Sequence, residues 1–273
     1  MKISVFGSTG FIGSRFCELY PEEVLPVPRN EYTTEEPSQV LYLISTTHNY
    51  GTWETNIETN LNHLLKTLNY HDNGDVFNFI SSWFIYGDVP LPACEHMQPN
   101  PRGGNYNLTK LWAEQLVQDY CGKHGIPYKI FRLANVFGKS DKFSNKKNAL
   151  QYLIDQMRQH IDIHLYNDGM FYRDYIHVDS VCRMLYEGMR KLPSCRIYNV
   201  GSGRSILFRD LILLAHSVLE SKSKILRMEP PKKHMRIQVK SFRMSVEKIG
   251  SYGIVDKSSP YEELYKMVKD EEN

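Results

Sequence analysis

Tyr106 and Lys110 are the residues whose types and spacing most clearly point to chemistry. They lie four residues apart at the start of a stretch with helical periodicity, so the phenol and the ammonium share one helical face. Tyrosine is a poor base because its ordinary pKa is about 10, and a neighbouring cation favours the phenolate. Tyr106 could then exchange a proton with a hydroxyl or carbonyl group. The alternative is an exposed helical pair, since this spacing is common.

Ser82 favours the chemical interpretation. It follows residues 76–81, an apolar run typical of a buried strand. In a parallel sheet, ligands lie beyond the carboxyl ends of the strands, so Ser82 would point into the ligand crevice.

A glycine-rich loop supplies a second signal. The sequence from Gly7 to Gly13 reads G-S-T-G-F-I-G and lies between an expected strand (2–6) and an expected helix (10–20). Glycines there let the backbone approach a pyrophosphate, and the helix N-terminus offers free N–H groups. A plain tight turn is the alternative. Beside a dinucleotide, Ser82, Tyr106 and Lys110 would form a hydride-transfer site. The expected cofactor contacts in this loop are Gly7, Thr9, Gly10, Phe11, Ile12 and Gly13.

Strand-like and helix-like segments alternate along the first half of the chain. This order predicts an α/β fold with a doubly wound parallel sheet of the Rossmann type. The polar segment 139–148 marks a boundary between a dinucleotide-binding domain (1–140) and a smaller α+β substrate lobe (141–273), with 175–200 partly returning to the first domain. The expected strands are 2–6, 24–27, 40–45, 76–81 and 128–134, and the expected helices of the first domain are 10–20, 57–70 and 106–124.

Composition and charge exclude several classes of protein. The formal charge is +2, from 33 basic and 31 acidic residues, so nucleic acid is not an expected partner. No apolar run approaches the roughly 20 residues of a membrane span, and the N-terminus does not form a secretory signal. The five cysteines are scattered and form no C-x-x-C, so no metal site is expected. We expect a cytoplasmic protein.

Together these segments resemble a known family, the extended short-chain dehydrogenases/reductases, and within it the NAD(P)-dependent nucleotide-sugar epimerases, dehydratases and 4-keto reductases. The resemblance covers most of the chain. The motifs that carry it are Gly7-x-x-Gly10-x-x-Gly13, S-S-W-F-I-Y-G (81–87), Glu95-x-x-x-Pro99-x-Pro101, Tyr106-x-x-x-Lys110 with Glu114, R-L-A-N-V-F-G (132–138), R-D-Y-I-H-V-D (173–179) and Y-N-V-G (198–201), with Asn60 at a structural asparagine position.

The resemblance implies roles for individual residues. Ser82 would hydrogen-bond the reacting oxygen, Tyr106 would be the acid/base, and Lys110 would bind the nicotinamide ribose and lower the pKa of Tyr106. Asn135 and Arg173 match positions that hold the diphosphate of a sugar nucleotide. The alternatives are a buried turn asparagine for Asn135 and, for Arg173, a salt bridge with a neighbouring Asp such as Asp174. Asp179 is expected to be a helix N-cap. A homodimer is implied, with helices 57–70 and 106–124 at the interface.

The chain departs from the family pattern in two places. Few residues separate the second strand from residue 40, so the sheet is smaller than usual and Arg29 follows the second strand. An arginine there favours the 2′-phosphate of NADP(H) over NAD(H), although the nearby Glu31 could serve NAD. Trp83 and Phe84 replace the Asp-Glu pair of 4,6-dehydratases; they are sugar-stacking platforms or core filling.

The short region after the second strand, with Arg29, resembles the reductase branch of the family and favours an NAD(P)-dependent reductase that acts on the 4-keto form of a nucleotide-linked sugar. The first alternative is a nucleotide-sugar epimerase that recycles NAD, and the second is a non-catalytic dinucleotide-binding sensor. A small non-nucleotide ketone or aldehyde is a third possibility for the substrate. The stretch 222–248 carries nine Lys or Arg and two Glu, and it is a solvated face or an anion site for a phosphorylated ligand.

Overall fold

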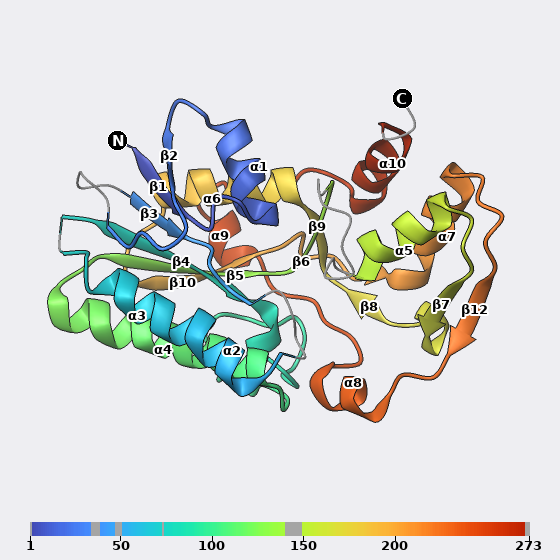
Figure 1. Ribbon diagram of the computed structural model, residues 1–273, viewed down its shortest axis with the longest axis horizontal. Helices are drawn as coiled ribbons and strands as arrows, with labels where there is room; N and C mark the ends of the chain where they lie inside the picture. Colours follow the sequence, from blue (N-terminus) through green and yellow to red (C-terminus); the bar gives the residue numbers. More distant parts are fainter. Residues whose placement is uncertain (1, 34–38, 47–50, 73, 140–148, 271–273) are drawn as a thin grey trace.

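A parallel sheet forms the centre of the molecule (Figure 1). The computed structural model describes residues 2–33, 39–46, 51–72, 74–139 and 149–270. Among these residues the sheet has six strands in the order β10-β5-β4-β3-β1-β2, and every pair is parallel. This confirms the predicted fold class. The strands are β1 (Ile3–Phe6), β2 (Val24–Val27), β3 (Gln39–Tyr42), β4 (Val76–Ser82), β5 (Tyr128–Leu133) and β10 (Arg196–Val200).

Helices cover both faces of this sheet, which explains the continuous apolar strands. Figure 1 shows α1 (Phe11–Leu19) and α6 (Val178–Lys191) over one face. The other face carries α3 (His63–Leu68) and α4 (Asn105–His124). All four residues of β1 and of β3 are buried, so the sheet lies between two apolar layers.

The helix expected at 57–70 differs from the prediction. It begins earlier, as α2 (Trp53–Ile57), because the side chain of Thr52 caps it by accepting from Thr55 N–H. A π-helical turn, η1 (Glu58–Asn62), then leads into α3. Such turns inside α-helices are frequent at functional sites. Here the turn contains Asn60, which is buried.

A second group of elements packs around its own apolar core, formed largely by residues from 150 to 268. Figure 1 shows these elements beside the carboxyl ends of the sheet strands. The predicted boundary falls on 139–148, of which only Lys139 lies within the described residues, so the domain division stays a prediction. The elements of this part and of the connections are η2 (Trp83–Ile85), β6 (Asn135–Phe137), α5 (Ala149–Arg158), β7 (Ile163–Tyr166), η3 (Asn167–Gly169), β8 (Tyr172–Arg173), β9 (Tyr175–His177), β11 (Ile206–Leu207), α7 (Phe208–Val218), β12 (Ile225–Met228), α8 (Lys232–Ile237), α9 (Glu247–Gly250) and α10 (Pro260–Asp270).

Candidate active site

Tyr106 and Ser82 meet at the carboxyl end of the sheet. Tyr106 is half-buried in the first turn of α4, and Ser82 is the last residue of β4. Burial raises the pKa of Tyr106, while hydrogen bonds with Ser82 and Ser45 act in the opposite direction. The Ser82 and Ser45 hydroxyls therefore lie near the Tyr106 phenol. Ser45 was not among the predicted site residues, although it follows the buried run of β3 as Ser82 follows that of β4.

Lys110 lies one helical turn after Tyr106 and is only 2% exposed. Its Nζ donates to the Ile80 carbonyl at 2.6 Å and lies 4.3 Å from the centre of the Phe79 ring. Burial lowers the pKa of Lys110 to about 7, and the carboxylate of Glu114 partly offsets this. Lys110 thus contacts strand β4, and its influence on the pKa of Tyr106 stays a prediction.

Asn60 connects the π-helical turn to this site. Its Oδ1 accepts from Thr46 N–H at 3.0 Å and from the Ser45 hydroxyl at 3.1 Å. Its Nδ2 donates to Thr109 Oγ1 in α4 at 3.0 Å. Asn60 therefore fixes the end of β3, and with it Ser45, against the helix that carries Tyr106.

A buried ion pair joins α4 to β5. Arg132 of β5 donates to Glu114 through Nε (3.1 Å) and Nη2 (2.8 Å), and both side chains are at most 2% exposed. The guanidinium also lies 4.7 Å from the Tyr86 ring centre. The Tyr86 hydroxyl donates to Asn199 Oδ1 at 2.7 Å. This network locks α4 to β5 and β10 one turn beyond Lys110.

The glycine loop forms a tight turn that leads directly into α1. Gly7 has φ +85°, a conformation that side chains disfavour. A Cβ on Gly13 would lie 2.2 Å from the Gly7 carbonyl oxygen, so no larger residue fits there. Gly10 is the N-cap of α1, and no side chain caps the first turn. The N–H groups of that turn are thus available for an anion.

A hollow of about 420 Å³ opens at this loop. Its lining includes Thr9, Gly10 and Phe11 of the loop together with Lys139 and His177. Ser82, Tyr106 and Lys110 do not line it, so the hollow reaches the loop rather than the hydroxyl cluster. The predicted contact Ile12 is half-buried in the first turn of α1, and Arg29 is exposed just after β2.

Among the predicted site residues, Arg173 is the best-defined candidate for binding an anion. It is 6% exposed, and Nη1 donates to the Tyr172 and Lys240 carbonyls while Nη2 donates to Val239. A guanidinium has five N–H donors. Within the described part of the chain, the Nε–H and one Nη2–H therefore remain without a protein acceptor, and these two form a side-on edge. Burial lowers the pKa of Arg173 to about 10.

The alternative salt bridge between Arg173 and Asp174 does not form. The Asp174 carboxylate accepts from the backbone and hydroxyl of Ser202 and from Gly203 N–H. Burial raises its pKa to about 6. Asn135 has a structural contact, because its Nδ2 donates to the Asp174 carbonyl at 3.2 Å. Arg173 and Asn135 therefore flank Asp174.

Aromatic side chains form the wall beside Tyr106. Phe84 packs edge-on against Tyr106, with ring centres 5.9 Å apart, and stacks on Trp83 at 4.2 Å. Trp83 is 4% exposed and also contacts Phe242 at 4.6 Å. Trp83 is thus core filling, while the half-buried Phe84 faces the site.

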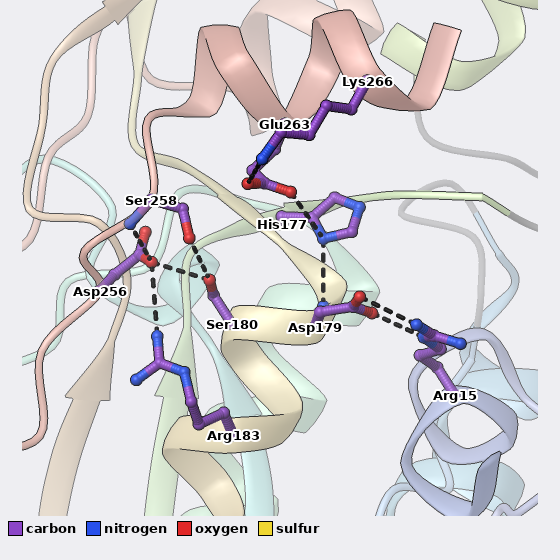
Figure 2. A network of polar contacts seen from close by, with 9 residues as sticks. All are labelled: Arg15, His177, Asp179, Ser180, Arg183, Asp256, Ser258, Glu263 and Lys266. Atoms are coloured by element: carbon purple, nitrogen blue, oxygen red, sulfur yellow. Dashed lines mark hydrogen bonds and ion pairs between the residues drawn. The ribbon is translucent and has the colours of Figure 1, made fainter. Parts of the chain in front are cut away.

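A polar network joins the helix of the glycine loop to two later helices (Figure 2). Arg15 of α1 binds the Asp179 carboxylate with two bonds of 2.6 and 2.9 Å. His177 is the N-cap of α6, since its Nδ1 accepts from Asp179 N–H; the prediction of Asp179 as the N-cap was wrong. Glu263 of α10 lies 3.9 Å from the same nitrogen. The network joins α1 to α6, both of which line the hollow, and connects α6 to α10.

Among the residues that the structure describes, no helix has the length and apolar character to cross a membrane. These residues also contain no group of three or more His, Cys, Asp or Glu side chains arranged to hold a metal ion.

Comparison with known proteins identifies the family. Residues 31–201 match the sequence profile of the NAD dependent epimerase/dehydratase family. The match covers more than half of the chain, and the chain belongs to this family.

One curated protein and two solved structures show what the chain is similar to. GDP-6-deoxy-D-mannose reductase of Pseudomonas aeruginosa is 26% identical over 254 residues, covering 83% of each chain. The crystal structure of UDP-glucose 4-epimerase from Thermotoga maritima with UDP-glucose has a TM-score of 0.86 at 22% identity, covering 100% of this chain and 99% of that one. The structure of RMD from Pseudomonas aeruginosa with NADPH has a TM-score of 0.82 at 21% identity, covering 98% of both chains. The first curated relatives are matched over only 39% to 50% of their length.

Proposed function

We propose that the chain is an NAD(P)-dependent oxidoreductase that reduces the 4-keto form of a nucleotide-linked sugar. The observation that carries the proposal is the cluster of Ser82 and Tyr106 at the end of β4, with Lys110 one turn further along α4. In the sheet, β3 alone separates β4 from β1, whose carboxyl end leads into the glycine loop. Proton transfer and dinucleotide binding therefore belong to one edge of the sheet.

The residues of the cluster have separate roles in this proposal. A bound nicotinamide dinucleotide supplies the hydride. Tyr106 donates a proton to the carbonyl oxygen of the sugar, and the Ser82 hydroxyl holds that oxygen in place. Lys110 exchanges its bond with the Ile80 carbonyl for the ribose hydroxyls of the cofactor. Burial raises the pKa of Tyr106, and the Ser82 and Ser45 hydroxyls offset part of that increase.

The residues of the glycine loop fit a dinucleotide. Gly7 takes the positive φ of the turn, and Gly13 lets α1 pack closely against the Gly7 carbonyl. The uncapped turn beginning at Phe11 then presents N–H groups to the pyrophosphate. Arg29 favours NADP(H) in the proposal, because an exposed guanidinium after the second strand suits a 2′-phosphate. Unchanged NADP(H) affinity in Arg29→Ala would refute this preference, and a loss of NAD(H) affinity in Glu31→Gln would reverse it.

Arg173 and Asn135 are proposed to bind the diphosphate of the substrate. The free side-on edge of Arg173 matches two phosphate oxygens, and the cation is buried. Asn135 would turn its amide from the Asp174 carbonyl toward the ligand. A small non-nucleotide ketone would leave this edge unused. Thermal stabilisation by nucleoside diphosphates separates the two substrate classes.

The aromatic wall opposes dehydratase chemistry. Elimination of a sugar hydroxyl needs an acid and a base besides the tyrosine, and paired carboxylates supply them. Trp83 and Phe84 cannot exchange protons. The nearest candidate along the chain, Asp88, is held by Arg102 Nε at 2.5 Å. We therefore expect no dehydration of an unmodified nucleotide hexose.

A screen of sugar nucleotides with NADPH and with NADH tests the function. A reductase consumes the reduced cofactor in proportion to product, whereas an epimerase interconverts sugars without net loss of it. A dinucleotide-binding sensor would bind the cofactor and turn over none of the sugars. Cofactor loss with a 4-keto sugar nucleotide, abolished in Tyr106→Phe, is the expected result.

A homodimer and a cytoplasmic location complete the proposal. On the outer side of α2 and α4, Trp53 and Trp112 stack at 5.8 Å although each is about 40% exposed. Of the predicted leucine stripe, Leu64 and Leu68 are fully buried and Leu65 is 40% exposed. A second copy would cover the exposed side chains. Sedimentation of a monomer alone at micromolar concentration would contradict the dimer, and cell fractionation tests the location.

A further inference from the structure

Residues 235–240 run along the substrate side of the site, and two arginines grip their backbone. We call these six residues the strap. Arg102 Nη1 donates to the Met235 and Gln238 carbonyls at 3.1 and 2.7 Å. Arg173 donates to the next two carbonyls, Val239 at 2.7 Å and Lys240 at 3.0 Å. The strap is therefore held from both ends.

Arg102 satisfies the carboxyl end of α8. The last carbonyls of a helix have no partner within it, and a cation is favoured there. Arg102 itself is tied in two further ways. Its Nε binds Asp88, and its own carbonyl accepts from Asn107 Nδ2 in α4 at 3.1 Å. Since Asn107 directly follows Tyr106, Arg102 links the catalytic helix to the strap.

Packing joins the strap to the same place. Ile237 is 5% exposed, and a Cβ added to Gly104 would lie 3.3 Å from its Cγ1. Beyond the strap, Phe242 contacts Trp83, which stacks on Phe84 beside Tyr106. The strap thus lies between the start of α4 and the aromatic wall, with Arg173 on its inner side.

We propose that Arg102 is a positioning residue for substrate binding. By holding the carboxyl end of α8, Arg102 keeps the Val239 and Lys240 carbonyls where they orient Arg173. Arg173 then presents its remaining Nε and Nη2 edge toward the diphosphate. This inference rests on the proposed nucleotide-sugar substrate, and it assigns to Arg102 an effect on binding rather than on proton or hydride transfer.

The test compares Arg102→Ala with Arg183→Ala. Arg183 is a matched control because its side chain is 38% exposed, against 37% for Arg102, and it also donates to a backbone carbonyl, that of Val255. Hydrogen exchange of the backbone amides in 232–242 is measured together with the affinity for UDP, GDP, dTDP and NADPH. Arg102→Ala should speed that exchange and weaken nucleoside diphosphate binding by about tenfold each, the effect of losing a charged hydrogen bond.

NADPH affinity and the urea midpoint should stay at the wild-type values in both variants, and Arg102→Lys should recover part of the binding. Faster exchange with unchanged nucleoside diphosphate affinity would overturn the positioning role, as would unchanged exchange. An equal loss of NADPH affinity would show that Arg102 supports the fold in general. That result would also overturn the positioning role. If the wild type binds none of the nucleoside diphosphates, the proposed substrate class fails and this inference fails with it.

Discussion

Replacing Lys110 by methionine should stabilise the protein while abolishing its activity. Lys110 is nearly fully buried, and burial lowers its pKa from 10.5 to about 7. At about 1.4 kcal/mol per pKa unit, the charged form carries a penalty of about 5 kcal/mol in the folded state. Methionine removes this penalty but also the hydrogen bond to the Ile80 carbonyl and the contact with Phe79. The net gain is about 2–4 kcal/mol after these losses.

The stability difference between Lys110→Met and the wild type should depend on pH. The unfolded lysine keeps its proton up to its ordinary pKa, whereas the folded one loses it near pH 7. Between these values the unfolded state binds more protons, so wild-type stability from this group rises with pH. Below pH 7 the penalty is complete. The advantage of Lys110→Met is therefore largest in mild acid and shrinks as the pH rises.

Urea unfolding followed by fluorescence at about pH 6 and about pH 9 measures this difference. Lys129→Met is the control, because Lys129 is 4% exposed, donates to the Met189 carbonyl, and has its pKa lowered by burial to about 8. It should also stabilise the protein but leave turnover unchanged. A Lys110→Met protein that is less stable than the wild type at pH 6 refutes the reasoning. A difference that does not shrink with rising pH refutes it equally.

Three other substitutions, two of them paired with a control variant, test the site and its support. Tyr106→Phe should lower turnover by about a thousandfold or more, because general acid catalysis is lost. The dinucleotide Kd should change by less than about twofold. Equal losses of turnover and of dinucleotide affinity would mean that Tyr106 has a binding role. Gly13→Ala should weaken dinucleotide binding by about a hundredfold, about 3 kcal/mol, because its Cβ meets the Gly7 carbonyl. Gly122→Ala, where a Cβ meets nothing within 4 Å, should leave binding intact. Glu114→Gln should cost about 3–5 kcal/mol in urea unfolding because it strands the buried Arg132. Glu18→Gln, which breaks the exposed pair with Arg15, should cost less than about 1 kcal/mol; similar costs would contradict the burial argument.

The sequence predicted the parts of the fold that depend on short-range pattern. The apolar run at 76–81 and the periodicity at 106–124 correspond to β4 and α4 to within one residue at either end. The parallel order followed from their alternation. The glycine loop was found because its spacing is a property of neighbouring residues. The proximity of Ser82 and Tyr106 was predictable for the same reason, because Ser82 ends a strand and Tyr106 lies in the first turn of a helix.

Long-range contacts were beyond the same reasoning. No local pattern shows that the Arg102 side chain reaches carbonyls more than 130 positions away. Arg15 of α1 binds the Asp179 carboxylate from a distant part of the sequence, while His177 is the N-cap of α6. The early start of α2 was a missed local signal, since Thr52 is a favourable N-cap residue.

The place of β10 in the sheet bears on how the chain folds during synthesis. Strand β5 pairs with β4 on one side and with β10 on the other, yet β10 is made only after β6, α5 and α6. A ribosome adds about 5–20 residues per second, so the outer edge of β5 stays open for several seconds. An open edge invites pairing with other chains. Truncation after residue 140 would make that exposure permanent, so a shortened chain should aggregate even though it contains the whole glycine loop and the Tyr106–Lys110 helix.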